Sequence, residues 1–186
     1  SRNEWMQQSL ALTSLATRTM GQEKHVIIAG FGRTGQSIAR LLDEENISYH
    51  ALDLDPQRVQ DAQAAGAKVS YGDTSRRESL IAAGIHRAAA LVVTYADTQA
   101  ALRTLHFANE LAPTLPAIVR SADETDLDKL RAGGADEVVP ETIESSLMLA
   151  SHALLVVGVP LRRVVHRVQR ARSERCVHAR LFPWRG

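Results

Sequence analysis

The sequence predicts an α/β fold: a doubly wound parallel sheet of six strands in the order 3-2-1-4-5-6, with further helices at its C-terminal end. Three observations support this prediction. Short runs of Val, Ile, Leu and Ala alternate with segments of helical period, glycines stand a few residues before three of these runs, and a GxGxxG motif follows the first run. Because apolar strands joined by helical crossovers pair in parallel, helices should cover both faces of the sheet.

The six predicted strands are short apolar runs separated by helix-length intervals. They occupy residues 25–29, 49–53, 68–71, 89–94, 116–120 and 136–139. Residue types that end or begin helices punctuate the intervals. C-caps are expected at Gly66, Gly84 and the pair Gly133 and Gly134, and N-caps at Asp97 and Asp123.

Two segments lie outside this unit. Residues 1–22 are expected to form a linker or a short helix. Beyond Glu141, a helix of about 17 residues runs to Val157, Gly158 and Pro160 interrupt it, and a second helix continues to about Arg172. The predicted organisation is therefore 1–22, a main domain over 23–141, and C-terminal helices with a basic tail over 142–186.

The composition is that of a soluble globular protein. Of 186 residues, 45% are hydrophobic and 23% are charged, with a formal net charge of +1. The single cysteine, Cys176, excludes an intrachain disulfide and favours a reducing compartment, and its arginine neighbours favour the thiolate. The longest apolar run, residues 146–161, is shorter than the ~20 residues that cross a bilayer, and no signal-peptide pattern is present.

The basic charge is concentrated in the tail. From Val159 onward there are eight Arg and one Glu, a charge of about +7, whereas the rest of the chain carries about −6. Within the tail an amphipathic helix is expected, with Leu161, Val164, Val165 and Val168 on one face and Arg162, Arg163, His166, Arg167 and Arg170 on the others.

Two interpretations of this basic helix remain open. It is either the solvated side of a helix packed on its own domain, or a surface for a negative partner. That partner would be an acidic domain, anionic lipid, or the acidic cluster at residues 123–128 of another protomer. With a pI of about 8.0 and 4% aromatic residues, the chain does not resemble a nucleic-acid-binding protein.

The GxGxxG motif is a candidate phosphate cradle in a Rossmann-like fold. Gly30 permits a tight turn, Gly32 lets a pyrophosphate approach the backbone, and Gly35 lets the helix pack closely on the strand. The N-terminus of that helix would hold phosphate, assisted by Arg33 and Thr34. The alternatives are a purely structural turn and, for Arg33, a solvated surface charge.

An acidic residue follows at the distance expected for a ribose ligand. Asp53 ends the second predicted strand, where a carboxylate accepts hydrogen bonds from ribose hydroxyls. Because it would repel a 2′-phosphate, NAD or another adenosine nucleotide is favoured over NADP. Asp55 is equally well explained as a helix N-cap.

Beyond these motifs, the sequence resembles one family. AGFGRTGQ, ALDLDP, YGDTSR, VVTYAD and IVRSAD together resemble the RCK/KTN domain, also called the TrkA N-terminal domain, and most closely the cytoplasmic domain of Kef-type potassium/proton antiporters. The resemblance covers residues 25 to about 157. GDT after the third strand is its most discriminating piece, because ordinary dehydrogenases do not require it.

The resemblance implies a set of nucleotide contacts. Asp73 would border the adenine, unless it only forms a turn, and Arg120 would line the far side of the crevice, unless it only pairs with Asp123 or Glu124. The complete candidate set is Gly30, Phe31, Gly32, Arg33, Thr34, Gly35, Asp53, Leu54, Asp73, Thr74, Thr94, Tyr95, Ala96, Asp97 and Arg120.

The resemblance also implies a function. The domain would bind NAD(H) or AMP and gate a Kef-type potassium efflux antiporter, with the membrane-embedded domain in the same chain, at the cytoplasmic face of the inner membrane. It would form a homodimer through residues 143–157, whose apolar set would equally suit packing on its own sheet: Ile143, Leu147, Ala150, Leu154 and Val157. Where the glutathione-responsive branch commonly has a second arginine, this chain has Ala122, which weakens the case for control by glutathione.

No catalytic apparatus is apparent in the sequence. The chain is too short for a two-domain dehydrogenase, the seven histidines form no metal-binding pattern, and no nucleophile elbow occurs. His25, His50 and His106 are expected to be structural. The nucleotide is therefore expected to act as a signal, with no catalytic residue and no metal. The alternatives are an NAD-dependent oxidoreductase and a stand-alone Trk-type potassium-uptake regulator.

Overall fold

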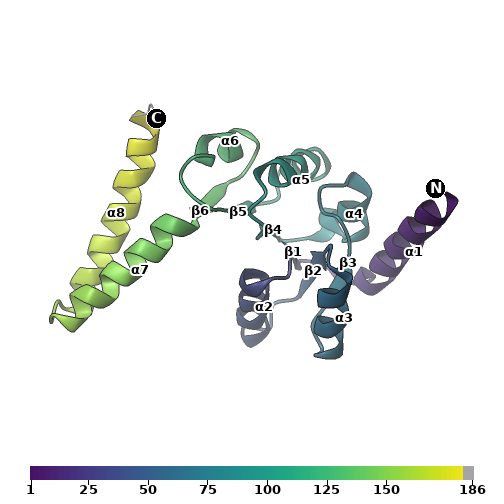
Figure 1. The fold of residues 1–186 in the computed structure, drawn as a ribbon, viewed down its shortest axis with the longest axis horizontal. Coiled ribbons are helices and arrows are strands. Elements are labelled where there is room, and N and C mark those ends of the chain that lie inside the picture. The colour runs from purple at the N-terminus through teal and green to yellow at the C-terminus, as the bar shows by residue number, and fades with distance from the viewer. Residues whose placement is uncertain (182–186) are drawn as a thin grey trace.

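A computed structural model describes the backbone of residues 1–181 and the side chains of residues 1–174, so the side chain of Cys176 lies outside the described part. Its centre is a six-stranded parallel sheet in the order β3-β2-β1-β4-β5-β6, which confirms the predicted topology (Figure 1). The strands are β1 (Val26–Ala29), β2 (Tyr49–Asp53), β3 (Val69–Tyr71), β4 (Ala90–Val93), β5 (Ala117–Ser121) and β6 (Glu137–Pro140). Each lies within one or two residues of its predicted position.

Helices cover the two faces unequally. On one face lie α2 (Arg33–Glu44) and α3 (Pro56–Ala64), and on the other lie α4 (Arg77–Ala82), α5 (Thr98–Leu111) and α6 (Leu127–Ala132) (Figure 1). A short 3-10 helix, η1 (Ile85–Arg87), leads into β4. The two faces carry separate apolar clusters, one built around Ile28, Ala51 and Val69, the other around Leu91 and Val119.

The helix ends follow the sequence with one exception. Gly66, Gly84 and Gly134 have positive φ values of 89°, 77° and 112° just past α3, α4 and α6, as expected of C-terminal glycines. Asp97 caps α5 by accepting a hydrogen bond from the Ala100 amide at 3.0 Å. The predicted N-cap at Asp123 is wrong.

Helix α6 begins three residues later than that prediction requires, at Leu127, and its N-cap is Asp126. Asp123 instead accepts the Thr125 amide hydrogen bond at 2.8 Å, which closes a tight turn ahead of the helix. Hydrogen bonds from Thr125 lower the pKa of the Asp123 carboxyl.

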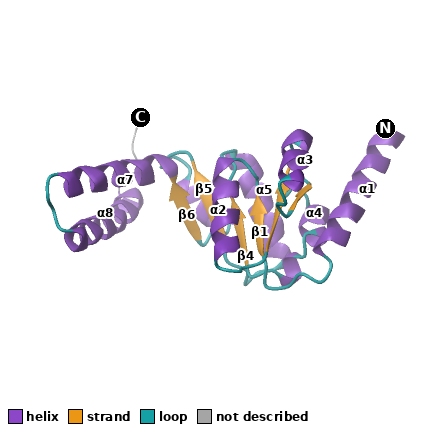
Figure 2. Cartoon of the chain, turned by 90° about the horizontal axis from the view of Figure 1, so that it is seen from below, coloured by secondary structure: helices purple, strands orange, loops and turns teal. Residues whose placement is uncertain are grey.

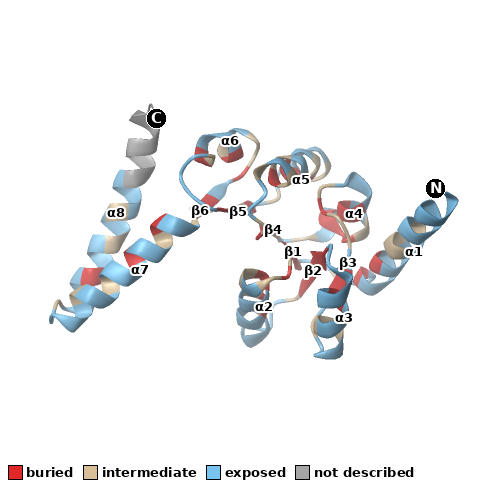
Figure 3. Ribbon diagram, in the orientation of Figure 1, coloured by how far each residue is buried: buried red, intermediate tan, exposed pale blue. Residues whose placement is uncertain are grey.

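The N-terminal segment forms a full helix rather than a linker or short helix. Helix α1 (Arg2–Thr19) starts with a capping box between Ser1 and Glu4. It packs on α4 and β3 through fully buried Leu15, and the Thr19 hydroxyl donates to the Ala82 carbonyl at 2.6 Å. Its first half projects from the domain (Figures 1 and 3).

The C-terminal segment forms a helical hairpin beyond β6. Helices α7 (Glu141–Val156) and α8 (Leu161–Leu181) pack on each other and extend away from the sheet (Figure 2). Gly158, with φ of 95°, makes the turn between them. The Arg172 guanidinium pairs with the Glu144 carboxylate across the hairpin. Among the described residues, no helix combines the length and apolarity that a bilayer span needs.

Much of the apolar surface of this hairpin stays exposed (Figure 3). Of the apolar set on α7, Ile143 and Leu147 are buried, whereas Val157 is 77% exposed. Among the described side chains of α8, Val164 alone is buried, whereas Leu161 is 65% and Val165 47% exposed. The start of α7, with Ile143 and Leu147, therefore packs against its own domain, whereas the rest of the apolar set is partly or largely exposed.

One half of the sheet also has an incompletely covered face. Residues of β1 and β2 are buried on both sides, but in β5 the burial alternates, with Ile118 and Arg120 only partly buried between buried neighbours. Val92 and Val139, on the same face, are also partly buried. Parallel sheets are normally covered on both faces, but no helix in the described part of the chain covers this half-face.

Two buried histidines lie near the end of the sheet at which the strands begin. His25 is fully buried and its Nε2 lies 2.8 Å from the Ala83 carbonyl oxygen, whereas His50 Nε2 lies 2.8 Å from the Ser70 hydroxyl. Burial lowers the pKa of both imidazoles, that of His50 to about 4, and the positive charges of His25, Arg18 and Lys68 contribute to the shift of His50. Both histidines are thus structural, as expected.

Acid is expected to destabilise the fold through His50. Between pH 6.5 and about 4 the unfolded chain binds a proton at His50 that the folded chain does not, so stability is complete above pH 6.5 and falls as the pH falls. The shift corresponds to a loss of about 3 kcal/mol. Urea denaturation across this pH range should show the loss in the natural chain and a smaller one in His50→Gln. The exposed-site variant His86→Gln should keep the full loss, and an unchanged pH profile in His50→Gln would contradict the assignment.

Candidate functional site

The glycine loop between β1 and α2 is shaped by two close backbone contacts. Gly30 has φ of 99°, and a methyl group there would lie 2.5 Å from the Thr94 hydroxyl oxygen. A methyl group at Gly35 would overlap the Gly30 carbonyl oxygen. The Thr94 hydroxyl further holds the loop, lying 2.9 Å from the Ala29 and 3.0 Å from the Gly30 carbonyl oxygen. The first and third glycines of the motif are therefore required by the fold itself.

Gly32 differs from the other two glycines of the motif. Its φ is −74°, which any residue adopts, and nothing within 4 Å would meet a methyl group there. It is the N-cap of α2, and no side chain caps this helix terminus. Exposed Arg33 and partly buried Thr34 follow it. An open space thus lies over the positive end of a 12-residue helix, which suits phosphate.

Asp53 links this loop to the end of β2. Its side chain is 7% exposed, and its Oδ2 accepts a hydrogen bond from the Phe31 amide at 2.7 Å. Its Oδ1 accepts from the Asp55 amide at 2.9 Å. The guanidinium of Arg58, on α3, approaches both oxygens, at 3.3 and 3.2 Å. The carboxylate therefore lies beside the phosphate cradle, as the sequence predicted.

Asp55 itself has the structural role that the sequence allowed. Its carboxylate accepts hydrogen bonds from the Gln57 and Arg58 amides at 3.0 and 3.3 Å, which makes it the N-cap of α3.

The far side of the crevice is formed by the ends of β4 and β5. Arg120 donates to the Thr94 carbonyl at 2.8 Å, and its guanidinium pairs with Glu141 at the start of α7. The alternative prediction, that Arg120 pairs with Asp123 or Glu124, is therefore wrong. Because Glu141 begins the hairpin, Arg120 connects the crevice to it.

Tyr95 connects the crevice to the loop after β3. Its hydroxyl lies 2.9 Å from the Thr74 hydroxyl and 2.5 Å from that of Thr104 on α5, and burial raises the pKa of Tyr95. Asp73 makes a turn by accepting hydrogen bonds from the Ser75 amide and hydroxyl, at 3.0 and 2.6 Å. Asp73 therefore forms a turn, as one interpretation held, and its position beside adenine stays a prediction. Ala96, the next residue after Tyr95, is exposed.

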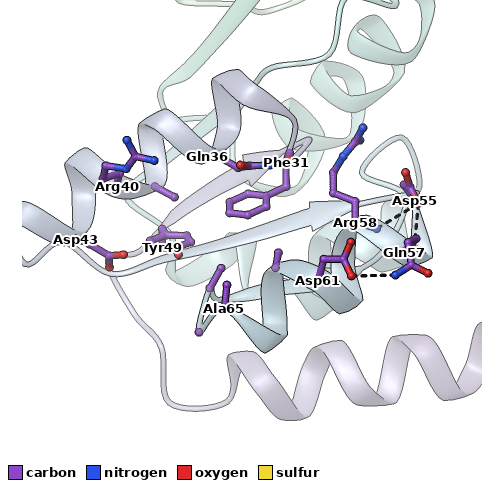
Figure 4. A pocket seen from close by; sticks show the side chains of 14 residues that line it. Phe31, Gln36, Arg40, Asp43, Tyr49, Asp55, Gln57, Arg58, Asp61 and Ala65 are labelled. Carbon is purple, nitrogen blue, oxygen red and sulfur yellow. Dashed lines mark hydrogen bonds between the residues drawn. The ribbon is translucent and has the colours of Figure 1, made fainter.

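Three of the candidate residues line two grooves outside the glycine loop. The Phe31 ring packs in the apolar cluster beneath α2 and lines a groove of about 680 Å³ between α2 and α3 (Figure 4). Its contribution to the crevice is therefore its backbone. Leu54 and Asp73 line a second groove, of about 350 Å³, which Trp5 of α1 also lines.

Three contacts of the site were not predicted from the sequence. These are the Arg58 contact with Asp53, the Phe31 amide on the same carboxylate, and the pairing of Arg120 with Glu141. Only the first had a signal, since an arginine five residues after the acid falls in the first turn of the next helix. Among the described residues, no group of three or more His, Cys, Asp or Glu side chains has the arrangement of a metal site.

Comparison with known proteins gives a consistent family. Residues 26–141 match the TrkA-N domain. The chain is 48% identical over 155 residues to the putative K(+) efflux antiporter KefB of Alkalimonas amylolytica, covering 83% of this chain and 23% of the relative. The chain thus spans less than a quarter of the length of the curated relatives that it matches.

Solved structures share the fold. The Kef C-terminal domain of Shewanella denitrificans, in its AMP-bound form, superposes with a TM-score of 0.70 at 28% identity, covering 86% of this chain and 99% of that one. The GsuK channel bound to NAD superposes with a TM-score of 0.65 at 20% identity, over 70% of this chain and 24% of that one, and shows the fold alone.

Proposed function

The chain belongs to the TrkA-N domain family, and from this premise we propose that it is a regulatory domain that binds an adenine nucleotide, AMP or NAD(H). The observation that carries the proposal is the pairing of an open phosphate cradle with an acidic residue on the adjacent strand. Gly32 leaves space over the α2 terminus, and Asp53 lies beside the same loop. The AMP-bound Kef domain, 28% identical, supports AMP as the first ligand to test.

In this proposal the nucleotide is a signal that controls a Kef-type potassium efflux/proton antiporter. The membrane domain would lie in the same chain, and this domain at the cytoplasmic face of the inner membrane. The relatives that support it are antiporters several times longer than this chain. Nucleotide binding changes transport only if the ligand prefers one of two conformations, and such preferences are typically worth ~1–3 kcal/mol. Arg120, which touches both the crevice and the hairpin through Glu141, offers a route for that preference.

We also propose that two copies associate through the α7–α8 hairpin and the open half-face of the sheet. Exposed apolar side chains on the hairpin include Leu149, 75% exposed, and Val156, 85% exposed. The half-face formed by β4, β5 and β6 is covered by no helix of the described residues, and Ile118 is partly buried near its centre. The exposed apolar side chains of a second α7 are of the right chemistry to cover it.

Calorimetric titration of the purified chain with AMP, NADH and NADP is the direct test. AMP and NADH are expected to bind. Asp53→Ala is expected to weaken both by on the order of a hundredfold, because the ribose loses hydrogen bonds to a charged acceptor. Asp55→Ala is the matched control: it removes the α3 cap, at a cost of about 1 kcal/mol in stability, but leaves the ribose acceptor in place.

Two results would contradict this function. Failure of both AMP and NADH to bind the folded natural chain would reduce the glycine loop to a structural turn. Oxidation of NADH in the presence of a small carbonyl compound would instead favour the oxidoreductase alternative.

A further inference from the structure

The carboxylate of Asp53 has no free acceptor position. A carboxylate offers about four lone-pair sites. In this chain each oxygen accepts one backbone amide, from Phe31 or Asp55, and each is also approached by Nη1 of Arg58. A ribose that uses Asp53 must therefore displace one of these donors.

The three donors differ in how easily they can leave. The Phe31 and Asp55 amides are fixed by the backbone of the two loops and make bonds of 2.7 and 2.9 Å. The Arg58 side chain is 44% exposed, and its single nitrogen straddles the carboxylate at 3.2 and 3.3 Å. Such long, half-exposed ion pairs are weak, and a long side chain reorients without disturbing the fold.

We infer that Arg58 is a specificity-determining residue of the nucleotide site: it covers the ribose-binding side of Asp53 and offsets the negative charge that a 2′-phosphate would meet. This inference rests on the proposed nucleotide binding. A nucleotide with a free ribose displaces the guanidinium and takes its place on the carboxylate. A nucleotide with a 2′-phosphate keeps the guanidinium close, because arginine binds phosphate well.

Arg58 changes the preference between NAD and NADP that Asp53 alone would give. An isolated carboxylate repels a 2′-phosphate, and that was the reason for favouring NAD over NADP. With Arg58 on the same carboxylate, the two charges are balanced and the discrimination against a 2′-phosphate is weaker than Asp53 alone would give. Removing Arg58 should therefore act in opposite directions on the two nucleotide classes.

The test compares AMP with adenosine 2′,5′-bisphosphate in calorimetric titrations of the 186-residue chain. Arg58→Met keeps the length of the side chain but removes its charge and donors. It is expected to bind AMP more tightly and the bisphosphate more weakly. The dissociation constant of the bisphosphate divided by that of AMP should therefore rise by about fivefold or more. Arg58→Lys, which retains the charge, should keep the ratio near that of the natural chain. Arg40→Met removes another arginine from the same groove and should leave the ratio unchanged.

An unchanged ratio in Arg58→Met, with AMP still bound, would overturn the role of Arg58 and leave the nucleotide site standing. An equal change in Arg40→Met would also overturn it, since the effect would then be general electrostatics. Failure of the natural chain to bind either nucleotide would overturn both the site and this inference. In a crystal structure with AMP, the Arg58 guanidinium should have left Asp53, and its persistence there alongside the bound ribose would contradict the displacement.

Discussion

Gly32→Ala is expected to weaken AMP binding by on the order of a hundredfold while the fold remains intact, because a methyl group would fill the space that phosphate needs. The structure shows why the fold should tolerate the change. Gly32 has an ordinary φ of −74°, and no atom within 4 Å would meet the methyl group. Alanine is a poorer N-cap than glycine, so a stability loss of about 1 kcal/mol is expected. Calorimetry and urea denaturation of the same variant measure the two effects separately.

Gly35→Ala is the matched contrast to this variant. The added methyl group would overlap the Gly30 carbonyl oxygen, so α2 would have to move away from β1. A stability loss of about 3 kcal/mol or more is expected from such overpacking against backbone. If Gly32→Ala instead bound AMP as the natural chain does, phosphate would not sit over the α2 terminus and the proposed site would be wrong.

If two copies associate as proposed, the double variant Leu149→Glu with Val156→Glu is expected to convert that dimer into a monomer. Both side chains project from α7 into solvent in the single chain, at 75% and 85% exposure, so charges there should not disturb the fold. In a dimer each change would bury an unpaired carboxylate in an apolar contact, which is strongly unfavourable. Sedimentation equilibrium at several protein concentrations measures the change in mass directly.

A control for this variant is available at the opposite end of the sheet. Helix α1 lies beyond β3, far from the hairpin (Figure 1), and its Leu10 is 68% exposed, so Leu10→Glu should leave the proposed dimer intact. A natural chain that is monomeric at all concentrations would contradict association through the hairpin. Dissociation by Leu10→Glu alone would move the interface to the α1 end.

Most of the fold was predictable from the sequence because the strands are short, apolar and separated by glycine-ended helices. The six strands, their order and the C-terminal glycines follow from these patterns. The start of α6 was not predictable from Asp123, because an acidic residue ahead of a helix closes a turn as readily as it caps. The extent and docking of α1 depend on Leu15 and Thr19 meeting α4, a contact between segments far apart in the chain.

The candidate site was predictable in its positions but not in its contacts. The glycine spacing placed the cradle, and the acid at the end of the second strand placed Asp53 beside it. Side-chain pairing decides the rest. Arg58 pairs with Asp53, and Arg120 pairs with Glu141. The sequence alone does not identify these pairs, because it offers several acidic residues to each arginine.

The empty space around Gly32 has a consequence for how this sequence would drift over evolutionary time. Selection for folding alone would retain Gly30 and Gly35, whose surroundings exclude a larger side chain, and would retain Asp53, which joins two loops. It would place no such demand on Gly32. A descendant that no longer needed its ligand would keep most of the GxGxxG signature and lose only the middle glycine. In this architecture, therefore, that one residue carries the information about binding, while the rest of the motif records the fold.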